Sequence, residues 1–322
     1  MSRQGLPTTR RLGPVDVARG IAVLAMVIYH TGWDLGELRL TVTDLREVPA
    51  WNAFARTIAA SFLLMVGAGL VLAHRDRFRP RAFLRRLATV AGAALAVSVV
   101  TLFVFPTSWI FFGILHCIAV SSVLALPFLR LAVPFVLVAA FAIMAQPFVA
   151  TVPLFDWPPL AFTGLGGRLP DTNDYVPLFP WFGVVLLGVA LTRLTLPWLK
   201  RLPERTGTDP GPVRWLAFAG RHSLVIYLVH QPLVFGVLAG YAALGLRSPD
   251  ADAAPFRRNC ELSCRAGNTS EEACRTACAC VIDAVRREEI WPRIAARTTT
   301  PEDRVRVPTV ARECFAQAWP GD

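Results

Sequence analysis

Charged residues are scarce in this chain. They make up 17% of its 322 residues, whereas hydrophobic residues make up 54%, and the mean hydropathy is +0.47. A sequence so poor in charge is too apolar for an ordinary soluble domain. Seven apolar runs approach the roughly 20 residues that a bilayer core requires, at about 14–33, 51–73, 83–105, 109–127, 131–150, 179–199 and 213–245. The last run is long enough to split in two, so we predict an all-α polytopic membrane bundle of about seven transmembrane helices, or eight.

The C-terminal tail lacks net charge, because residues 247–322 contain twelve arginines and twelve acidic residues. The net charge of +10 therefore lies in residues 1–246, where basic segments precede the first apolar run and separate the second from the third and the sixth from the seventh. By the positive-inside rule, these segments place the N-terminus in the cytoplasm, and seven spans then place the tail outside. Because the charge has this topological explanation, we expect a lipid bilayer and no nucleic acid as partner.

Cysteine is almost absent before the tail, where Cys117 alone lies in an apolar run and is expected to be a small buried side chain. The other six cysteines lie in the tail: Cys260, Cys264, Cys274, Cys278, Cys280 and Cys314. Two pairs of them are spaced i, i+4, so each pair lies on one helix face. We predict two helices joined by Cys260–Cys278 and Cys264–Cys274, with Cys280–Cys314 as a third disulfide, in an oxidising compartment. A zinc site is the alternative; it is disfavoured because the tail has neither histidine nor CxxC spacing, so no metal is expected.

The chain therefore divides into a transmembrane domain, 1–246, and a Cys-rich extracytoplasmic helical tail, 247–322. Ionisable residues inside the spans of the first domain are functional candidates, because burying them in lipid is costly. Arg19 and His30 are eleven residues apart, about three helical turns, so they lie within roughly 20° of each other. Asp16 and Asp34, eighteen residues apart, join the same stripe. The alternatives are a cytoplasmic anchor for Arg19, a helix-packing role for His30, and a solvated Asp34 rather than one that orients the His30 ring.

Histidine is also rare, with five in the chain, yet His30, His116 and His230 all fall in the outer halves of predicted spans. This common depth predicts a shared polar cavity, or else three separately hydrogen-bonded residues. The segment "DTNDYVPLFPW" precedes the sixth span. It forms either an aromatic belt or the lip of a cavity, in which Asp174, Tyr175 and Trp181 suit a polyhydroxylated ligand.

Four blocks of the sequence resemble a known superfamily. "DVARGIAVLAMVIYH" resembles the first span of the acyltransferase-3 branch of the transmembrane acyltransferase superfamily, whose Arg/Lys-x10-His motif matches Arg19 and His30. "FGILHCIAVS", "DYVPLFPWFGVVLLGVAL" and "GRHSLVIYLVHQPL" are more similar to the branch that contains heparan-α-glucosaminide N-acetyltransferase and its bacterial relatives, the DUF1624 group. The resemblance covers roughly residues 12–245 and does not include the tail.

The resemblance implies an acyltransferase of the bacterial cytoplasmic membrane. Such an enzyme moves an acetyl group from cytoplasmic acetyl-CoA to a hydroxyl or amine of an extracytoplasmic sugar or glycolipid. In the acyltransferase-3 branch the motif histidine is catalytic, which corresponds to His30. The glucosaminide enzyme has an asparagine at that place and its histidine farther along, so His30, His116 and His230 all stay open. The histidine acts either as a general base or by an acetyl-histidine relay.

A cytoplasmic basic cluster matches the donor that the resemblance implies. Guanidinium groups fit phosphate oxygens, so we expect CoA to be bound by the arginines of this cluster: Arg79, Arg81, Arg85 and Arg86. The alternative is a positive-inside loop without a ligand. Two other classes of function use the same intramembrane histidines, a proton-coupled transporter and a non-catalytic membrane scaffold. The transporter is disfavoured because no inverted internal repeat is evident.

Overall fold

The computed structural model describes residues 13–41, 45, 48–74, 77–149, 151–199, 210–244, 249–266, 270–295 and 298–318, and in these residues it is helical without a strand. Arg75, a basic residue between the second and third predicted spans, lies outside this set. The chain divides into two compact units. The first comprises Met1–His30 with Ala50–Pro232, and the second comprises Thr31–Pro49 with Leu233–Asp322. The predicted domain boundary at residue 246 stays a prediction.

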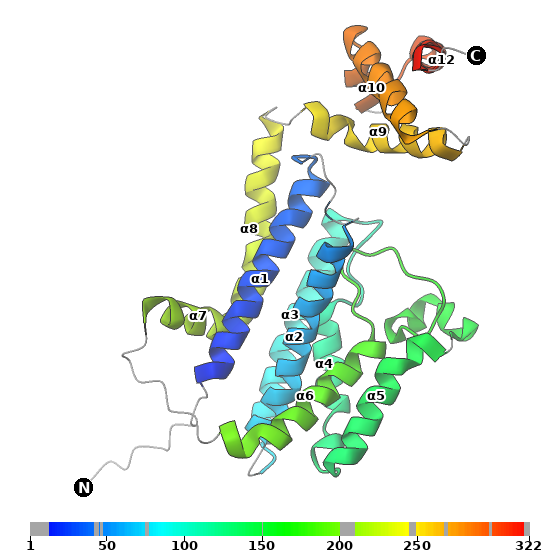
Figure 1. The fold of residues 1–322 in the computed structure, drawn as a ribbon. Coiled ribbons are helices and arrows are strands. Elements are labelled where there is room, and N and C mark those ends of the chain that lie inside the picture. Colours follow the sequence, from blue (N-terminus) through cyan, green and yellow to red (C-terminus); the bar gives the residue numbers. More distant parts are fainter. Residues whose placement is uncertain are drawn as a thin grey trace. The chain divides into compact units, whose positions relative to one another are not determined.

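Five helices are long enough and apolar enough to cross a membrane. They are α1 (Gly13–Glu37), α2 (Pro49–Ala73), α3 (Pro80–Val104), α6 (Leu178–Leu199) and α8 (Ser223–Ala243), as labelled in Figure 1. The fourth and fifth predicted runs form shorter apolar helices, α4 (Ile114–Leu124) and α5 (Val133–Val149). The seventh run splits at His222 into α7 (Gly211–Arg221) and α8. These helices confirm the predicted all-α membrane fold.

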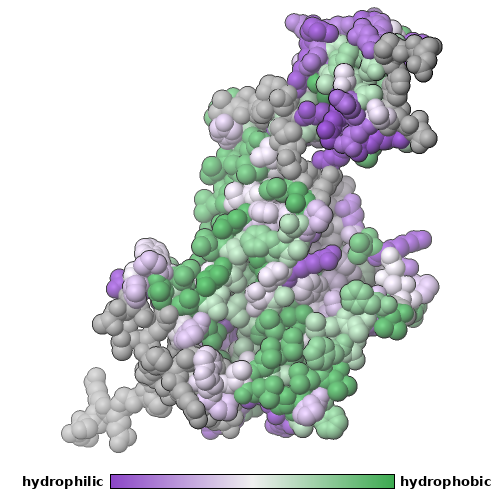
Figure 2. All heavy atoms as spheres, viewed as in Figure 1, coloured by the Kyte–Doolittle hydropathy of each residue, from purple (hydrophilic) through white to green (hydrophobic). Residues whose placement is uncertain are grey.

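Large apolar side chains cover the outside of these helices. Phe103, Phe135 and Phe148 are 81%, 68% and 89% exposed, and Figure 2 shows apolar atoms gathered over the long helices of the first unit. So much exposed apolar surface is unfavourable in water, whereas lipid tails remove the penalty. The first unit is therefore a membrane body.

Glycines let α2 and α6 approach closely. A Cβ added at Gly67 would lie 2.1 Å from the carbonyl oxygen of Val185, and one at Gly188 would lie 2.3 Å from that of Leu64. Small residues at a crossing are the usual means of packing helices in lipid, where no hydrophobic effect drives them together. Around this crossing, α2, α4, α5 and α6 share one buried core, which includes Leu63, Leu70, Cys117, Val136, Val185 and Leu186. Cys117 is buried as predicted.

The tail consists of α9 (Pro249–Ala266), α10 (Glu271–Arg287), the short α11 (Trp291–Ala295) and α12 (Pro301–Ala318). Cys260–Cys278 and Cys264–Cys274 join α9 to α10, and Cys280–Cys314 joins α10 to α12. The predicted pairing is confirmed, and with all six sulfurs in disulfides the zinc alternative is wrong. The i, i+4 spacing produces this result because it turns two sulfurs of one helix towards two of the next.

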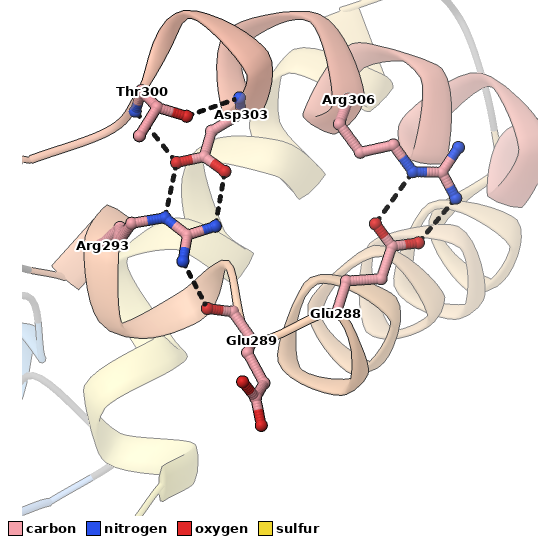
Figure 3. A network of polar contacts seen from close by, with 6 residues as sticks. All are labelled: Glu288, Glu289, Arg293, Thr300, Asp303 and Arg306. Atoms are coloured by element: carbon pink, nitrogen blue, oxygen red, sulfur yellow. Dashed lines mark hydrogen bonds and ion pairs between the residues drawn. The ribbon is translucent and has the colours of Figure 1, made fainter.

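Two bidentate ion pairs hold α12 to the segment around α11 (Figure 3). Arg293 donates two hydrogen bonds of 2.7 Å to the buried carboxylate of Asp303, which also accepts from the backbone N–H of Thr300 at 2.9 Å. These donors hold the pKa of Asp303 well below its usual range. Arg306 likewise donates to Glu288 at 2.8 and 2.6 Å and lowers the pKa of that carboxyl group.

Candidate functional site

A cavity of about 770 Å³ lies in the first unit, a size typical of small-molecule sites. Residues of α1, α2, α3, α4, the segment before α6, α6 and α8 line it. Seven residues that the sequence singles out are among them: Arg19, His30, Arg85, Arg86, Asp174, Tyr175 and Trp181. Helix packing therefore brings the predicted arginines and the predicted lip residues, which lie in separate parts of the chain, onto one cavity.

The polar stripe of α1 faces this cavity. Arg19 and His30 both line it, as the eleven-residue spacing predicts. At 1.5 Å per residue they lie about 16 Å apart along the helix axis. Arg19 also pairs with Asp16 one turn earlier, at 3.8 Å. The cavity wall therefore runs for about three turns of α1, with a cation near one end and an imidazole near the other.

One part of the cavity is rich in arginine. Arg85 and Arg86 enter it from the second turn of α3, and Arg19 enters it from α1. The guanidinium Nη1 of Arg86 lies only 3.2 Å from the position of a Cβ at Gly69, so this glycine leaves room for it against α2. The charges of Arg19 and Arg86 interact unfavourably. An anion between them would relieve that repulsion, and phosphate and carboxylate oxygens both fit guanidinium groups.

Arg79 and Arg81 lie differently. Arg79 and Arg86 both line an adjoining cavity of about 210 Å³, together with His74, whereas Arg81 lines neither cavity. The sequence therefore predicted a broader arginine site than these cavities contain.

The segment before α6 forms another wall. Asp174 accepts a hydrogen bond of 3.0 Å from the backbone N–H of Ile114, at the N-terminus of α4. Burial raises the pKa of Asp174, and this bond opposes the rise. Tyr175 donates its hydroxyl to the carbonyl of Ala161 at 2.6 Å, and burial raises its pKa. The carboxylate of Asp174 and the hydroxyl of Tyr175 are therefore both hydrogen-bonded within the protein. Tyr175 offers a ligand chiefly its ring face. The segment lines the cavity, which favours the interpretation of 171–181 as its lip.

Further polar side chains lie on the cavity wall. Trp181 carries an indole N–H, Asn173 an amide and Tyr227 a hydroxyl, and all three residues line the cavity. Arg56 of α2 adds a further cation. Sequence reasoning missed Asn173, Tyr227 and Arg56. The first two lie in blocks that it did single out, whereas Arg56 carried no signal beyond a charge flanking a span.

The three intramembrane histidines have different surroundings. His30 lines the cavity. The ring of His230 lies against the ring of His30, with a centroid separation of 5.2 Å. His116 accepts a hydrogen bond from the N–H of Gly113 at its Nδ1 and bonds Ser98 through Nε2, both at 3.2 Å. Its Nδ1 therefore holds the start of α4, and its Nε2 joins α4 to α3. Of the three histidines, His30 is among the residues that line the cavity, whereas His116 and His230 are not, and the catalytic role of each stays a prediction.

Asp34 is fully buried, which excludes a solvated position at the end of α1. Its predicted role in orienting the His30 ring stays a prediction. Within the described part of the chain, no group of three or more His, Cys, Asp or Glu side chains is arranged to hold a metal ion.

The fold and the cavity define a class: a polytopic helical membrane protein with a ligand-sized site that combines arginines with an imidazole. Comparison with known families makes the class specific. The chain belongs to the family of the heparan-alpha-glucosaminide N-acetyltransferase catalytic domain, whose model matches residues 11–232. This confirms the resemblance predicted from the four sequence blocks. Every residue that lines the main cavity falls within the matched range. Searches of curated proteins and of solved structures found no match.

Proposed function

We propose that this membrane N-acetyltransferase family member takes its acetyl group from acetyl-CoA and transfers it to an amine or hydroxyl of a sugar or glycolipid. The observation that carries the proposal is that His30 lines the same cavity as Arg19, Arg85 and Arg86. Acyl transfer from a CoA thioester requires a cationic site for phosphates and a base for the acceptor, and one cavity here offers both.

The arginine-rich part of the cavity suits the donor. Arg19, Arg85 and Arg86 would bind the phosphates of CoA by charge-assisted hydrogen bonds, which also offsets the repulsion between Arg19 and Arg86. Arg79 extends this cationic surface into the adjoining cavity. The thioester end would then point along α1 towards His30, about 16 Å from Arg19.

His30 is the base in this proposal. Its neutral imidazole accepts a proton from the acceptor amine or hydroxyl, whose nitrogen or oxygen attacks the thioester carbonyl. A new amide or ester bond forms as the carbon–sulfur bond breaks. His30 then returns its proton to the departing thiolate, so the histidine ends the cycle neutral. An acetyl-histidine relay would instead leave the acetyl group on His30 when donor is supplied without acceptor.

The lip residues suit a polar acceptor. Trp181 offers a ring face and an N–H donor, and Asn173 offers an amide. Aromatic faces with hydrogen-bonding groups beside them are suited to sugar rings, which present C–H groups on a face and hydroxyls at the edge. The family name points to a terminal α-glucosaminide as the first acceptor to test.

Charge and cysteine chemistry support one orientation in the membrane. The arginines near the start of α3 belong to the basic segments that the positive-inside rule assigns to the cytoplasm, where acetyl-CoA is found. The disulfide-rich tail suits the oxidising side of a bacterial cytoplasmic membrane. Both observations support an N-terminus in the cytoplasm and an acceptor outside it.

The test is acetyl transfer by the full chain in lipid nanodiscs, supplied with labelled acetyl-CoA and a glucosaminide. We expect acceptor-dependent CoA release and an acetylated product. His30→Ala should lower the rate by about 10²–10⁴-fold, because it removes the base. His222→Ala is the matched control, since His222 is exposed and lines no described cavity. If the wild-type protein neither binds acetyl-CoA nor releases CoA with any amino or hydroxyl sugar, the enzyme proposal is wrong. Acetylated His30 in the absence of acceptor would establish the relay.

A further inference from the structure

His230 stands behind His30 and outside the set of residues that line the cavity. The two ring centroids are 5.2 Å apart, with ring planes inclined by 55°. The same His230 ring also lies near Tyr227, at 6.2 Å. His30 and Tyr227 both line the cavity and His230 does not, so His230 can act on a ligand only through a residue of the cavity wall, and His30 is the nearer of these two rings.

The hydrogen bonds of His230 determine which nitrogen carries its proton. Nδ1 lies 3.0 Å from the carbonyl oxygen of Ile226 and 2.9 Å from that of Tyr227. Carbonyl oxygens only accept, so Nδ1 must be the N–H donor. In a neutral ring Nε2 is then an unprotonated acceptor.

That acceptor has no partner among the residues that the structure describes. Nε2 of His230 is buried without a hydrogen bond, in a side chain that is 8% exposed. A buried polar atom that lacks a partner is costly, which makes such an atom in a folded protein a sign of a functional contact. The nearest ring that carries a complementary N–H is that of His30.

We infer that His230 is a positioning residue for His30, and that its Nε2 accepts a hydrogen bond from the His30 ring nitrogen on that side. The inference rests on the proposed function for its catalytic consequence, not for the contact itself. Rotation of the His30 ring within its side-chain torsion is enough to make the bond, since ring torsions of histidine are broad and catalytic bonds tighten when ligand binds.

The bond has two consequences. It holds neutral His30 with its N–H towards His230, which leaves the other ring nitrogen unprotonated and available to the cavity. When that nitrogen takes the proton of the acceptor, the resulting imidazolium still donates the N–H on its other side to Nε2 of His230, and the proton that it took up later leaves with the thiolate. His230 itself neither gains nor loses a proton in this sequence. It supplies a neutral acceptor in the place where other enzymes use a carboxylate.

A purely structural role for His230 makes a different prediction. In that case the important bond is the one from Nδ1 to the backbone of its own helix. Asparagine can keep a donor near the Nδ1 position, whereas glutamine can place an acceptor oxygen near Nε2. His230→Asn and His230→Gln therefore separate the two roles, and His222→Gln is the matched control, because His222 makes the same kind of intrahelical bond, Nδ1 to the carbonyl of Phe218 at 2.9 Å.

The first measurement is kcat and KM for acetyl transfer by the full chain in nanodiscs. We expect His230→Gln to keep most of the wild-type kcat, and His230→Asn to lose about 10–100-fold with little change in the KM of acetyl-CoA, the range found for residues that orient a functional histidine. His222→Gln should match the wild type. Equal kcat values for the two His230 variants, whether both high or both low, would overturn the inference, as would a larger loss in His230→Gln.

The second measurement does not depend on activity. Diethyl pyrocarbonate modifies an unprotonated imidazole nitrogen, and mass spectrometry localises the product to His30. We expect the rate at His30 to stay near the wild-type value in His230→Gln and to fall by about fivefold or more in His230→Asn, since loss of the acceptor favours an N–H that faces the cavity. Equal modification rates in the two variants would contradict the contact. If the wild type shows the expected rates but transfers no acetyl group, the contact stands and the proposed function fails.

Discussion

Arginine side chains give the cavity its charge at the scale of single residues. Asp174 is the single acidic residue among the described residues that line it, and its carboxylate is bonded to the start of α4. Four arginines line the same cavity, from α1, α2 and α3: Arg19, Arg56, Arg85 and Arg86. A low-dielectric site with this excess of cations favours an anionic ligand. If these arginines only anchored their helices at the cytoplasmic side of the membrane, by contrast, they would not need to line a cavity.

Arg86→Gln tests this assignment. Losing charge-assisted hydrogen bonds to a phosphate should raise the KM for acetyl-CoA by about 10-fold or more, with a smaller change in kcat. Arg86→Lys should recover only part of the loss, because an ammonium cannot form the two parallel bonds of a guanidinium. Arg77→Gln is the control, since Arg77 is exposed and lines neither described cavity. Equal KM values for Arg86→Gln and Arg77→Gln would remove Arg86 from the donor site.

Asp303 makes a residue-scale prediction for the tail. Its pKa is depressed by the hydrogen bonds from Arg293 and Thr300, so the carboxylate stabilises the fold at neutral pH. A depressed folded-state pKa means that this stability is present above the unfolded pKa of about 4 and is lost as the pH falls below it. Deuterium pulse labelling of the full chain should show α12 opening more as the pH drops from about 5 to about 3. Asp303→Asn should open α12 already at neutral pH and flatten this dependence; an unchanged pH profile in the variant would contradict it.

Helix crossings set the architecture at the scale of elements. At the α2–α6 contact the backbone of each helix occupies the space that a side chain at the glycine of the other would need. α2 supplies several residues that line the cavity, so the α2–α6 contact positions one wall of the cavity. The glycines of α2 and α6 are therefore packing residues, and the glycine content of these spans has a structural cause.

Gly67→Ala should destabilise the first unit by about 1–3 kcal/mol, because its Cβ would lie 2.1 Å from a backbone oxygen that cannot move freely. The matched control is Gly92→Ala in α3, where nothing lies within 4 Å of the added Cβ. There the substitution should be neutral or stabilising, because alanine suits a helix interior better than glycine does. Thermal unfolding of the full chain in detergent compares the two. Equal melting temperatures would show that the α2–α6 contact is not close.

Membrane topology is a property of the whole molecule. Charge distribution and disulfide chemistry both support a tail on the oxidising side of the membrane. The surface of the first unit is largely apolar, whereas that of α9–α12 carries many more polar residues (Figure 2). The orientation also determines which substrate reaches the cavity from which side.

Thiol labelling on intact cells checks the topology. Tail cysteines should resist an impermeant maleimide until an impermeant reductant opens the disulfides, and should then react without permeabilisation. Arg77→Cys provides the matched cytoplasmic site and should react only after permeabilisation. Labelling of the reduced tail that requires permeabilisation would place it in the cytoplasm.

Local patterns account for much of what could be predicted. The apolar runs, the stripe of Arg19 and His30 and the i, i+4 cysteine pairs each depend on the geometry of a single helix, which a sequence displays directly. The length of each helix was harder to predict from the sequence, since α4 and α5 are shorter than their apolar runs. Composition reports only that a segment avoids water, and not where its helix begins and ends.

The sequence by itself determined the helical membrane class, the three disulfides of the tail and the family. Only the tertiary structure decided which polar residues meet. It placed His230 against His30, two hundred residues away, and turned His116 onto the start of its own helix. It also brought Arg56, Asn173 and Tyr227 to the cavity. The reason is that periodicity assigns a residue to a face of its own helix, whereas the faces that come together depend on side-chain packing between helices far apart in the chain.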